Sequence, residues 1–126
     1  MDSEHISPLL IRTKQFSLRV VRMTQAIGRG READVIARQV LRSGTSVGAN
    51  YRAACRARST EDMIAKLKIV EEEADESMYW MELLVESNIM PEKRLLPLME
   101  ECNQILAMVV ASVLTLRKKA RSRRSR

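Results

Sequence analysis

The sequence predicts an all-α protein whose four helices pack as a bundle. Aromatic residues make up only 3% of the 126 residues, and there are eight methionines but four glycines. This composition favours helices, because strands are enriched in β-branched and aromatic residues. Apolar residues also recur at three- and four-residue intervals, which is the period of an amphipathic helix. A chain of this length forms one domain with a substantial core.

The first two predicted helices cover about residues 9–27 and 32–57. A stripe of apolar residues lies along each of them, which predicts one buried face per helix. The first helix should end at residues 28–30, Gly-Arg-Gly, since glycine commonly terminates helices. The stripes consist of Phe16, Val20, Met23 and Ile27 in the first helix and of Ile36, Val40, Val47, Tyr51 and Ala54 in the second.

Two glycines lie in the middle of the second predicted helix. Gly44 and Gly48 form a G-x-x-x-G pattern, and each glycine costs a helix about 1 kcal/mol relative to alanine. We expect them to permit a close approach of another helix, because small residues let two backbones come near. A phosphate-binding loop is the alternative, but no strand precedes the glycines and no Lys-Ser or Lys-Thr follows them.

The third and fourth predicted helices follow clear start and stop signals. Ser59 and Asp62 match a capping box, and Asn88 is a suitable end for the third helix. Pro91 marks the start of the fourth helix. Residues 105–116 of that helix are apolar on nearly every side, yet a bilayer span needs about 20 residues. We therefore expect this segment to face the bundle core on one side and a second subunit on the other, with no membrane involved.

The net charge of +6 is unevenly distributed along the chain. Residues 1–58 carry a net charge of +7, residues 59–116 carry −8 and residues 117–126 carry +7. We expect a flexible N-terminus over residues 1–8, a bundle over residues 9–116 and a disordered basic tail over residues 117–126. The tail suits contact with the phosphates of RNA or DNA; an anionic membrane, an acidic partner or a role in solubility are the alternatives. Its cations are Arg117, Lys118, Lys119, Arg121, Arg123, Arg124 and Arg126.

A polar set occupies the second and third predicted helices. Arg42, Ser46 and Asn50 are four residues apart and share one helix face, as do Glu73 and Glu76. If the two helices form a hairpin with a turn near residues 58–59, position 42 lies opposite about position 75. We interpret the set as a buried structural network that fixes the helix register. A ligand or partner site at the centre of the bundle is the alternative.

Catalytic patterns are scarce in this sequence. His5 is the only histidine, which excludes a histidine-based triad and Glu-x-x-His metal ligation. A metal site in the acidic run of residues 71–76 is less favoured than a solvated face. Cys55 and Cys102 are expected to be buried free thiols in a reducing cytoplasm, and the N-terminus has no signal region. We expect a non-enzymatic, cytoplasmic protein without a cofactor or metal.

One combination of residues resembles a known family. Its members are the small four-helix-bundle proteins encoded in intervening sequences of bacterial 23S ribosomal RNA genes, together with their stand-alone chromosomal relatives. The resemblance extends over about residues 9–118. The residues that carry it are Arg42-Ser43, Ser46, Asn50-Tyr51, Ser59, Glu73, Glu76, Tyr79-Trp80 and Leu83-Leu84.

The resemblance implies an up-down-up-down bundle that assembles as a ring-like homo-oligomer, a homopentamer around a central channel. It implies no established enzymatic activity. A related branch, the accessory proteins of diversity-generating retroelements, forms similar pentamers that bind nucleic acid and a reverse transcriptase. Many members carry an acidic residue shortly after the asparagine, where this chain has Ala53-Ala54. Two functions follow as expectations: electrostatic nucleic-acid binding, and a structural module that binds a protein partner.

Overall fold

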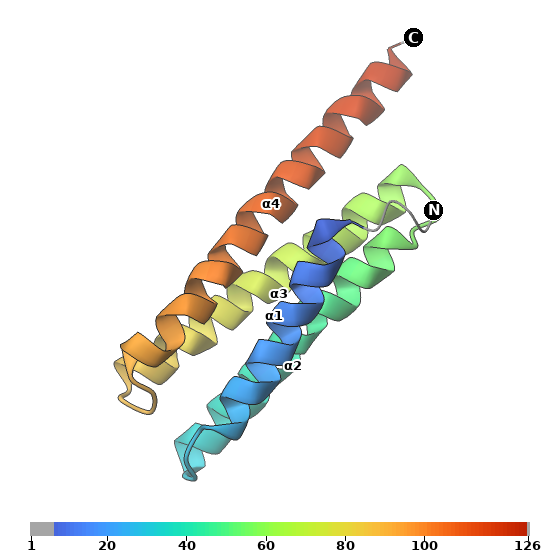
Figure 1. The fold of residues 1–126 in the computed structure, drawn as a ribbon. Helices are drawn as coiled ribbons and strands as arrows, with labels where there is room; N and C mark the ends of the chain where they lie inside the picture. The colour runs from blue at the N-terminus through green and yellow to red at the C-terminus, as the bar shows by residue number, and fades with distance from the viewer. Residues whose placement is uncertain (1–6, 126) are drawn as a thin grey trace.

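The computed structural model describes residues 7–125 and contains four α-helices. Their order is α1 (Pro8–Gln25), α2 (Arg31–Cys55), α3 (Thr60–Glu86) and α4 (Glu92–Arg124). Successive helices run in opposite directions (Figure 1), and residues 7–125 contain no strand. Helix α2 packs between α1 and α3, while α4 packs mainly on α3 and over a shorter stretch on α1. The predicted all-α, up-down-up-down four-helix bundle is confirmed.

The helix ends follow the predicted signals closely. The Ser59 hydroxyl accepts a hydrogen bond from the Asp62 N–H at 3.0 Å, which caps α3. The Asp62 carboxylate accepts from the N–H of Arg58 at 3.4 Å, one residue before the position that a capping box uses. After α3, Asn88 adopts a left-handed conformation with φ of 62°. Asparagine tolerates this conformation better than most residues, so it turns the chain toward α4.

The core consists of the apolar stripes that the sequence predicts. Phe16 and Val20 of the first stripe are fully buried, whereas Met23 and Ile27 pack at its edge. The six largest fully buried side chains come from α1, α3 and α4, while α2 contributes the smaller Val40 and Val47; the six are Phe16, Leu67, Met81, Leu84, Leu95 and Ile105.

The two glycines of α2 lie where α1 crosses it. A Cβ atom on Gly44 would lie 2.6 Å from a methyl group of Val20, and one on Gly48 would lie 2.6 Å from the Ser17 hydroxyl. Neither position therefore has room for a side chain. The predicted reason for these glycines, a close helix–helix approach, is confirmed.

The C-terminal part of the chain differs from the prediction. Helix α4 continues to Arg124, so residues 117–124 are helical here, which corrects the expected end of the helix at Leu116 and the expected disorder of the tail. At the other end, Pro8 already belongs to α1 and Ser7 caps it; residues 1–6 and Arg126 lie outside the described part of the chain.

The position of this C-terminal part follows from one contact between α3 and α4. The Cys102 thiol donates to the Ala74 carbonyl at 3.2 Å. Thr60 lies fourteen residues before Ala74, and the residue fourteen positions after Cys102 is Leu116. Because the helices are antiparallel, the start of α3 is level with Leu116, and everything beyond it projects past the bundle (Figure 1).

Helix α4 is also long and apolar enough, by length and composition, to cross a membrane. This differs from the expectation based on residues 105–116 alone. In the structure Ile105, Val109 and Val113 from this part of α4 are buried against the other helices. Its apolar character on that side is therefore accounted for by the bundle core.

Candidate nucleic-acid interface

The most basic surface lies on the projecting end of α4. We call residues 117–124 the basic extension. Every cation in it is exposed, and none forms an ion pair within residues 7–125. Because each helical residue turns by about 100°, the charges point in several directions around the axis. The cations are Arg117, Lys118, Lys119, Arg121, Arg123 and Arg124.

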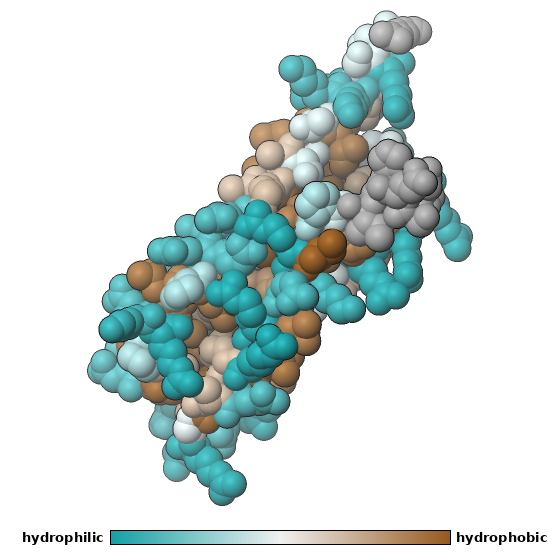
Figure 2. All heavy atoms as spheres, in the orientation of Figure 1, coloured by the Kyte–Doolittle hydropathy of each residue, from teal (hydrophilic) through white to brown (hydrophobic). Residues whose placement is uncertain are grey.

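The helical form of the basic extension has a physical basis. Cations near the C-terminus of a helix are favoured by the helix dipole, and three of them lie in the last turn of α4. At a rise of about 1.5 Å per residue, the extension adds about 12 Å of helix beyond the bundle. Figure 2 shows hydrophilic side chains covering this projecting end, with apolar side chains gathered directly below it. The charge is therefore presented on a rod that anionic ligands can approach from several sides.

The predicted polar set is only partly brought together. The Nη1 atom of Arg42 lies 3.2 Å from Oε2 of Glu73, and the Nη2 atom of Arg42 contacts the Glu76 carboxylate. The Trp80 indole N–H also donates to Glu76 at 3.1 Å. The predicted register, with position 42 opposite about position 75, therefore agrees with the structure.

The location of this set corrects the prediction of a buried network. The Arg42 side chain is 51% exposed, so the ion pairs lie at the surface between α2 and α3. Ser46 and Asn50 do not reach the glutamates. Their side chains instead donate to carbonyl groups of their own helix, those of Arg42 and Ser46, at 2.8 and 2.9 Å, as short polar side chains in helices often do.

The buried polar contact between α2 and α3 is a different one. Ser43 and Ser77 are both fully buried, and their hydroxyl oxygens lie 2.9 Å apart. The apolar periodicity indicates only that both positions face inward. Which serines meet depends on the rotation of the two helices about their axes, and the spacing of residues along the sequence does not determine that rotation.

A second ion pair that the sequence does not reveal joins α1 to α4. Arg12 donates from Nε to Glu101 Oε2 at 3.0 Å and from Nη2 to Glu101 Oε1 at 2.5 Å. It also donates to the Gln104 side chain at 3.0 Å. The hydrogen bond to Glu101 raises the pKa of the Arg12 guanidinium. This two-pronged contact holds α1 against α4, where the two helices share few other contacts.

The remaining reactive groups of the described chain are its thiols and its unpaired carboxylates. Both cysteines are free thiols, and Cys102 is buried as predicted, whereas the predicted burial of Cys55 is wrong because its side chain is partly exposed at the end of α2. Burial raises the pKa of the Cys55 thiol and raises that of Cys102 to about 12, which disfavours the reactive thiolate. Within residues 7–125 no three His, Cys, Asp or Glu side chains gather in a way that could hold a metal ion. His5 lies outside the described residues.

The architecture and the surface charges define the class of protein: a small antiparallel four-helix bundle with a basic helical projection. Comparison with known proteins is more specific. The family model of the 23S rRNA-intervening sequence proteins matches residues 9–111. The chain belongs to this family, as its residues 42–84 suggested.

A solved structure supports the assignment. It is a protein with unknown function from the S23 ribosomal protein family of Bacteroides thetaiotaomicron VPI-5482. The similarity has a TM-score of 0.79 at 30% sequence identity and covers 83% of this chain and 97% of the other. No curated protein is similar enough to count as a relative. The family match ends at residue 111, so the basic extension lies beyond the part of the chain that the family model covers.

Proposed function

We propose that this protein is a non-enzymatic, oligomeric helical bundle of the cytoplasm that binds RNA or DNA electrostatically. One observation carries the proposal: six exposed cations lie on the basic extension without a carboxylate partner in the described chain. Such a helix suits the phosphates of a nucleic acid, which supply the missing opposite charge. The two free thiols agree with a reducing compartment.

The composition of the basic extension determines what kind of binding is expected. It contains no aromatic residue on which a base could stack. Contacts to phosphates position a protein on nucleic acid but do not read the base sequence. If all six cations contact phosphates of a duplex, the logarithm of the affinity should fall with the logarithm of the salt concentration with a slope of about −5.

Fluorescence anisotropy with a structured RNA and a duplex DNA tests this proposal across a salt series. The full chain is compared with a chain that ends at Leu116 and with a full-length variant whose six extension cations are glutamine. We expect both altered proteins to bind much more weakly and with a shallower salt dependence. Unchanged binding by both would assign the activity to the folded bundle. No binding by the full chain at low salt would overturn the proposal.

The oligomer is supported by apolar side chains that the single chain leaves exposed. Ile11 on α1 is 57% exposed and Leu114 on α4 is 58% exposed. A second subunit that covered these two side chains would remove their apolar surface from water, which is favourable. We propose a homo-oligomer, and the family resemblance favours a ring-like pentamer.

Light scattering coupled to size-exclusion chromatography tests the assembly directly. The wild-type chain should elute as a multimer at micromolar concentration, and Leu114→Glu should shift it toward the monomer. The matched control is Thr115→Glu, which adds the same charge at the neighbouring exposed position. A monomeric wild-type chain would contradict this part of the proposal.

A protein-interaction module is the second candidate. The observation in its favour is that α3 exposes two large apolar side chains, Tyr79 at 53% and Ile69 at 40%. The Tyr79 ring packs edge-on against Trp80 with ring centroids 5.1 Å apart. This candidate leads if neither RNA nor DNA binds at low salt.

A further inference from the structure

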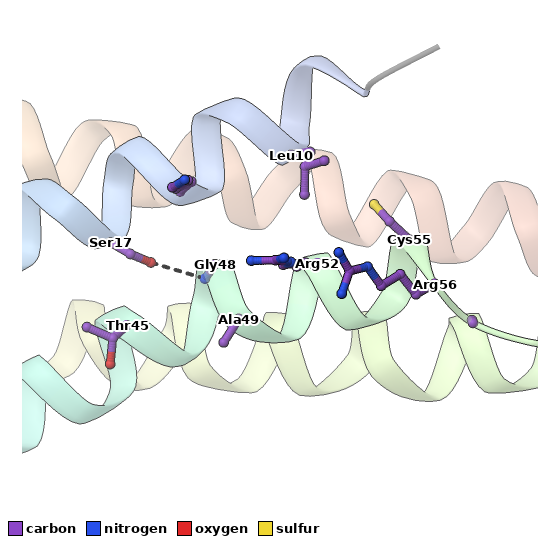
Figure 3. A pocket seen from close by; sticks show the side chains of 10 residues that line it. Leu10, Ser17, Thr45, Gly48, Ala49, Arg52, Cys55 and Arg56 are labelled. Carbon is purple, nitrogen blue, oxygen red and sulfur yellow. Dashed lines mark hydrogen bonds between the residues drawn. The ribbon is translucent and has the colours of Figure 1, made fainter. Parts of the chain in front are cut away.

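A groove with a basic rim runs between α1 and α2. Its volume is about 790 Å³, within the range of about 300–1,000 Å³ that is usual for ligand-binding clefts. Lys14 lines it from α1, Arg52 lines it from α2, and Arg56 lines it from the position directly after α2. Figure 3 shows the Arg56 side chain extending along α2 toward Arg52, with Leu10 of α1 opposite. We call this feature the cationic groove.

The charges of the cationic groove are not balanced by the described chain. Lys14, Arg52 and Arg56 are exposed, no Asp or Glu lines the groove, and none of the three cations forms an ion pair within residues 7–125. Only two other basic residues of these helices form ion pairs within residues 7–125, while Arg19, Arg22, Arg31 and Arg38 form none. Arg12 is paired with Glu101 and Arg42 with two glutamates. The cationic groove thus gathers three cations where an external anion can reach them.

Small residues line the cationic groove, and hydrogen bonds between α1 and α2 hold its two walls in place. Thr45, Gly48 and Ala49 of α2 are among these small residues. The Gly48 N–H donates to the Ser17 hydroxyl at 3.1 Å, and that hydroxyl donates to the Gly44 carbonyl at 2.9 Å. These bonds hold α1 against α2, so the cationic groove exists without a ligand. Most of the lining residues belong to α1 and α2 themselves, and only Arg56 and Ala57 lie in the connection that follows α2.

The cationic groove also lies near the base of the basic extension. Arg56 follows the last residue of α2, and the short connection to Thr60 brings the chain to the start of α3. The start of α3 is level with Leu116, the last residue before the basic extension. In Figure 1 the start of α1, the end of α2 and the projecting end of α4 all lie at the same end of the molecule. A single extended ligand can therefore approach both basic surfaces.

We propose that the cationic groove is a second phosphate-binding site, which takes a phosphodiester segment of a nucleic-acid strand through Lys14, Arg52 and Arg56. This inference rests on the proposed nucleic-acid function and deepens it. The three cations contact successive phosphates, while Leu10, Ala49 and Cys55 offer an apolar surface to the sugars. No aromatic residue lines the cationic groove, so it binds the backbone and not the bases.

The test uses a fluorescein-labelled single-stranded RNA of about 12 nucleotides, a length that spans a typical single-strand site. The groove variant is Arg52→Gln with Arg56→Gln in the full chain. The matched control is Arg29→Gln with Arg31→Gln, which removes the same charge from exposed positions at the opposite end of α2. We expect the groove variant to bind at least about tenfold more weakly and to lower the salt slope by about 1.4, since each contact to a single strand contributes about 0.7. The control should bind like the wild type.

The same two substitutions in the chain that ends at Leu116 separate this site from the basic extension. Residual binding by that shortened chain should disappear when the groove arginines are replaced. If the groove variant binds like the wild type while truncation abolishes binding, the groove proposal is overturned and the proposed function stands. If the full chain binds neither RNA nor DNA at low salt, both are overturned; if it binds duplex DNA but not this RNA, only the groove proposal is overturned.

A second measurement locates the strand without a charge substitution. Cys55 lines the cationic groove and is partly exposed, whereas Cys102 is buried elsewhere in the core. Saturating RNA should slow the alkylation of Cys55 in the wild-type protein severalfold. The weakly binding groove variant, at the same RNA concentration, should lose this protection. An unprotected Cys55 in an RNA-saturated wild-type protein would place the strand outside the cationic groove.

Discussion

The hydroxyl of Ser17 on α1 accepts a hydrogen bond from the backbone N–H of Gly48 on α2 at 3.1 Å. It also donates to the Gly44 carbonyl at 2.9 Å. In a regular helix the N–H of residue 48 and the carbonyl of residue 44 are partners of each other, so Ser17 lies against a backbone hydrogen bond of α2. Such an approach is possible only because residue 48 has no side chain.

Replacing Gly48 by alanine should therefore destabilise the fold. The added Cβ would lie 2.6 Å from the Ser17 hydroxyl and 3.1 Å from the Thr13 carbonyl. The intrinsic helix propensity of alanine favours the substitution by about 1 kcal/mol, but overpacking of this kind costs about 1–3 kcal/mol. We expect a net loss of about 1 kcal/mol in the free energy of unfolding, measured by urea denaturation. Gly28→Ala is the control, because its Cβ would meet nothing within 4 Å; an equal response of both variants would contradict the prediction.

Arg12 and Glu101 should be energetically coupled. Their contact joins α1 to α4 through two hydrogen bonds, and a bidentate geometry makes such pairs stronger than single-contact ion pairs. Because the Arg12 side chain is 35% exposed, we expect a coupling energy of only about 1 kcal/mol. A double-mutant cycle with Arg12→Ala and Glu101→Ala measures it by chemical denaturation. Additive effects of the two substitutions would show that the pair contributes nothing to stability.

The buried Ser43–Ser77 pair should respond non-additively to substitution. Ser77→Ala deprives a fully buried hydroxyl of its partner across the helix interface, and we expect a loss of about 1–2 kcal/mol. Replacing both serines by alanine removes the two polar groups together, which is often nearly neutral. The double variant should thus be more stable than the sum of the single effects predicts. Thermal unfolding of Ser43→Ala, of Ser77→Ala and of the double variant measures the three losses of stability and shows whether the single losses add.

Arg42→Ala should have a small effect on stability. A buried ion pair would lose about 3–5 kcal/mol on such a change, but Arg42 is half exposed and contacts its glutamates at the surface. We expect about 0.2–1 kcal/mol, the range of exposed ion pairs, and less at high salt. Urea denaturation at two salt concentrations tests this expectation. A salt-independent loss above about 2 kcal/mol would show that the pair behaves as a buried network.

The two thiols should react at different rates and respond to alkaline pH. Burial raises the pKa of Cys102 to about 12, whereas a cysteine in an unfolded chain ionises near about 8.5. The folded state therefore retains the proton of Cys102 to higher pH, and the stability that this proton contributes is lost as the pH rises from about 8.5 to 12.

At pH 8 we expect iodoacetamide to modify Cys55 well before Cys102, and mass spectrometry can follow the modification of each thiol. Equal rates in the folded protein would contradict the burial of Cys102, and urea should make the two rates equal.

Much of the fold could be predicted because it depends on local spacing. The apolar stripe of α1, the cap at Ser59 and the turn at Asn88 all depend on residues close in sequence, and the structure contains each of them. The glycines of α2 indicated a close helix contact, because nothing else explains two glycines in mid-helix. The register of α2 against α3 followed from counting back from a short turn.

The candidate sites depend much more on the tertiary structure. Arg12 and Glu101 are 89 residues apart, and only the packing of α1 on α4 brings them together. Ser46 and Asn50 have the spacing of a shared face, but the rotation of α2 leaves them bonded to their own helix. The cationic groove likewise exists because two helices meet at a particular rotation. Local periodicity in the sequence determined the helices and their buried faces, whereas the rotations and relative offsets of the helices, set by packing of the whole core, determined which polar side chains meet.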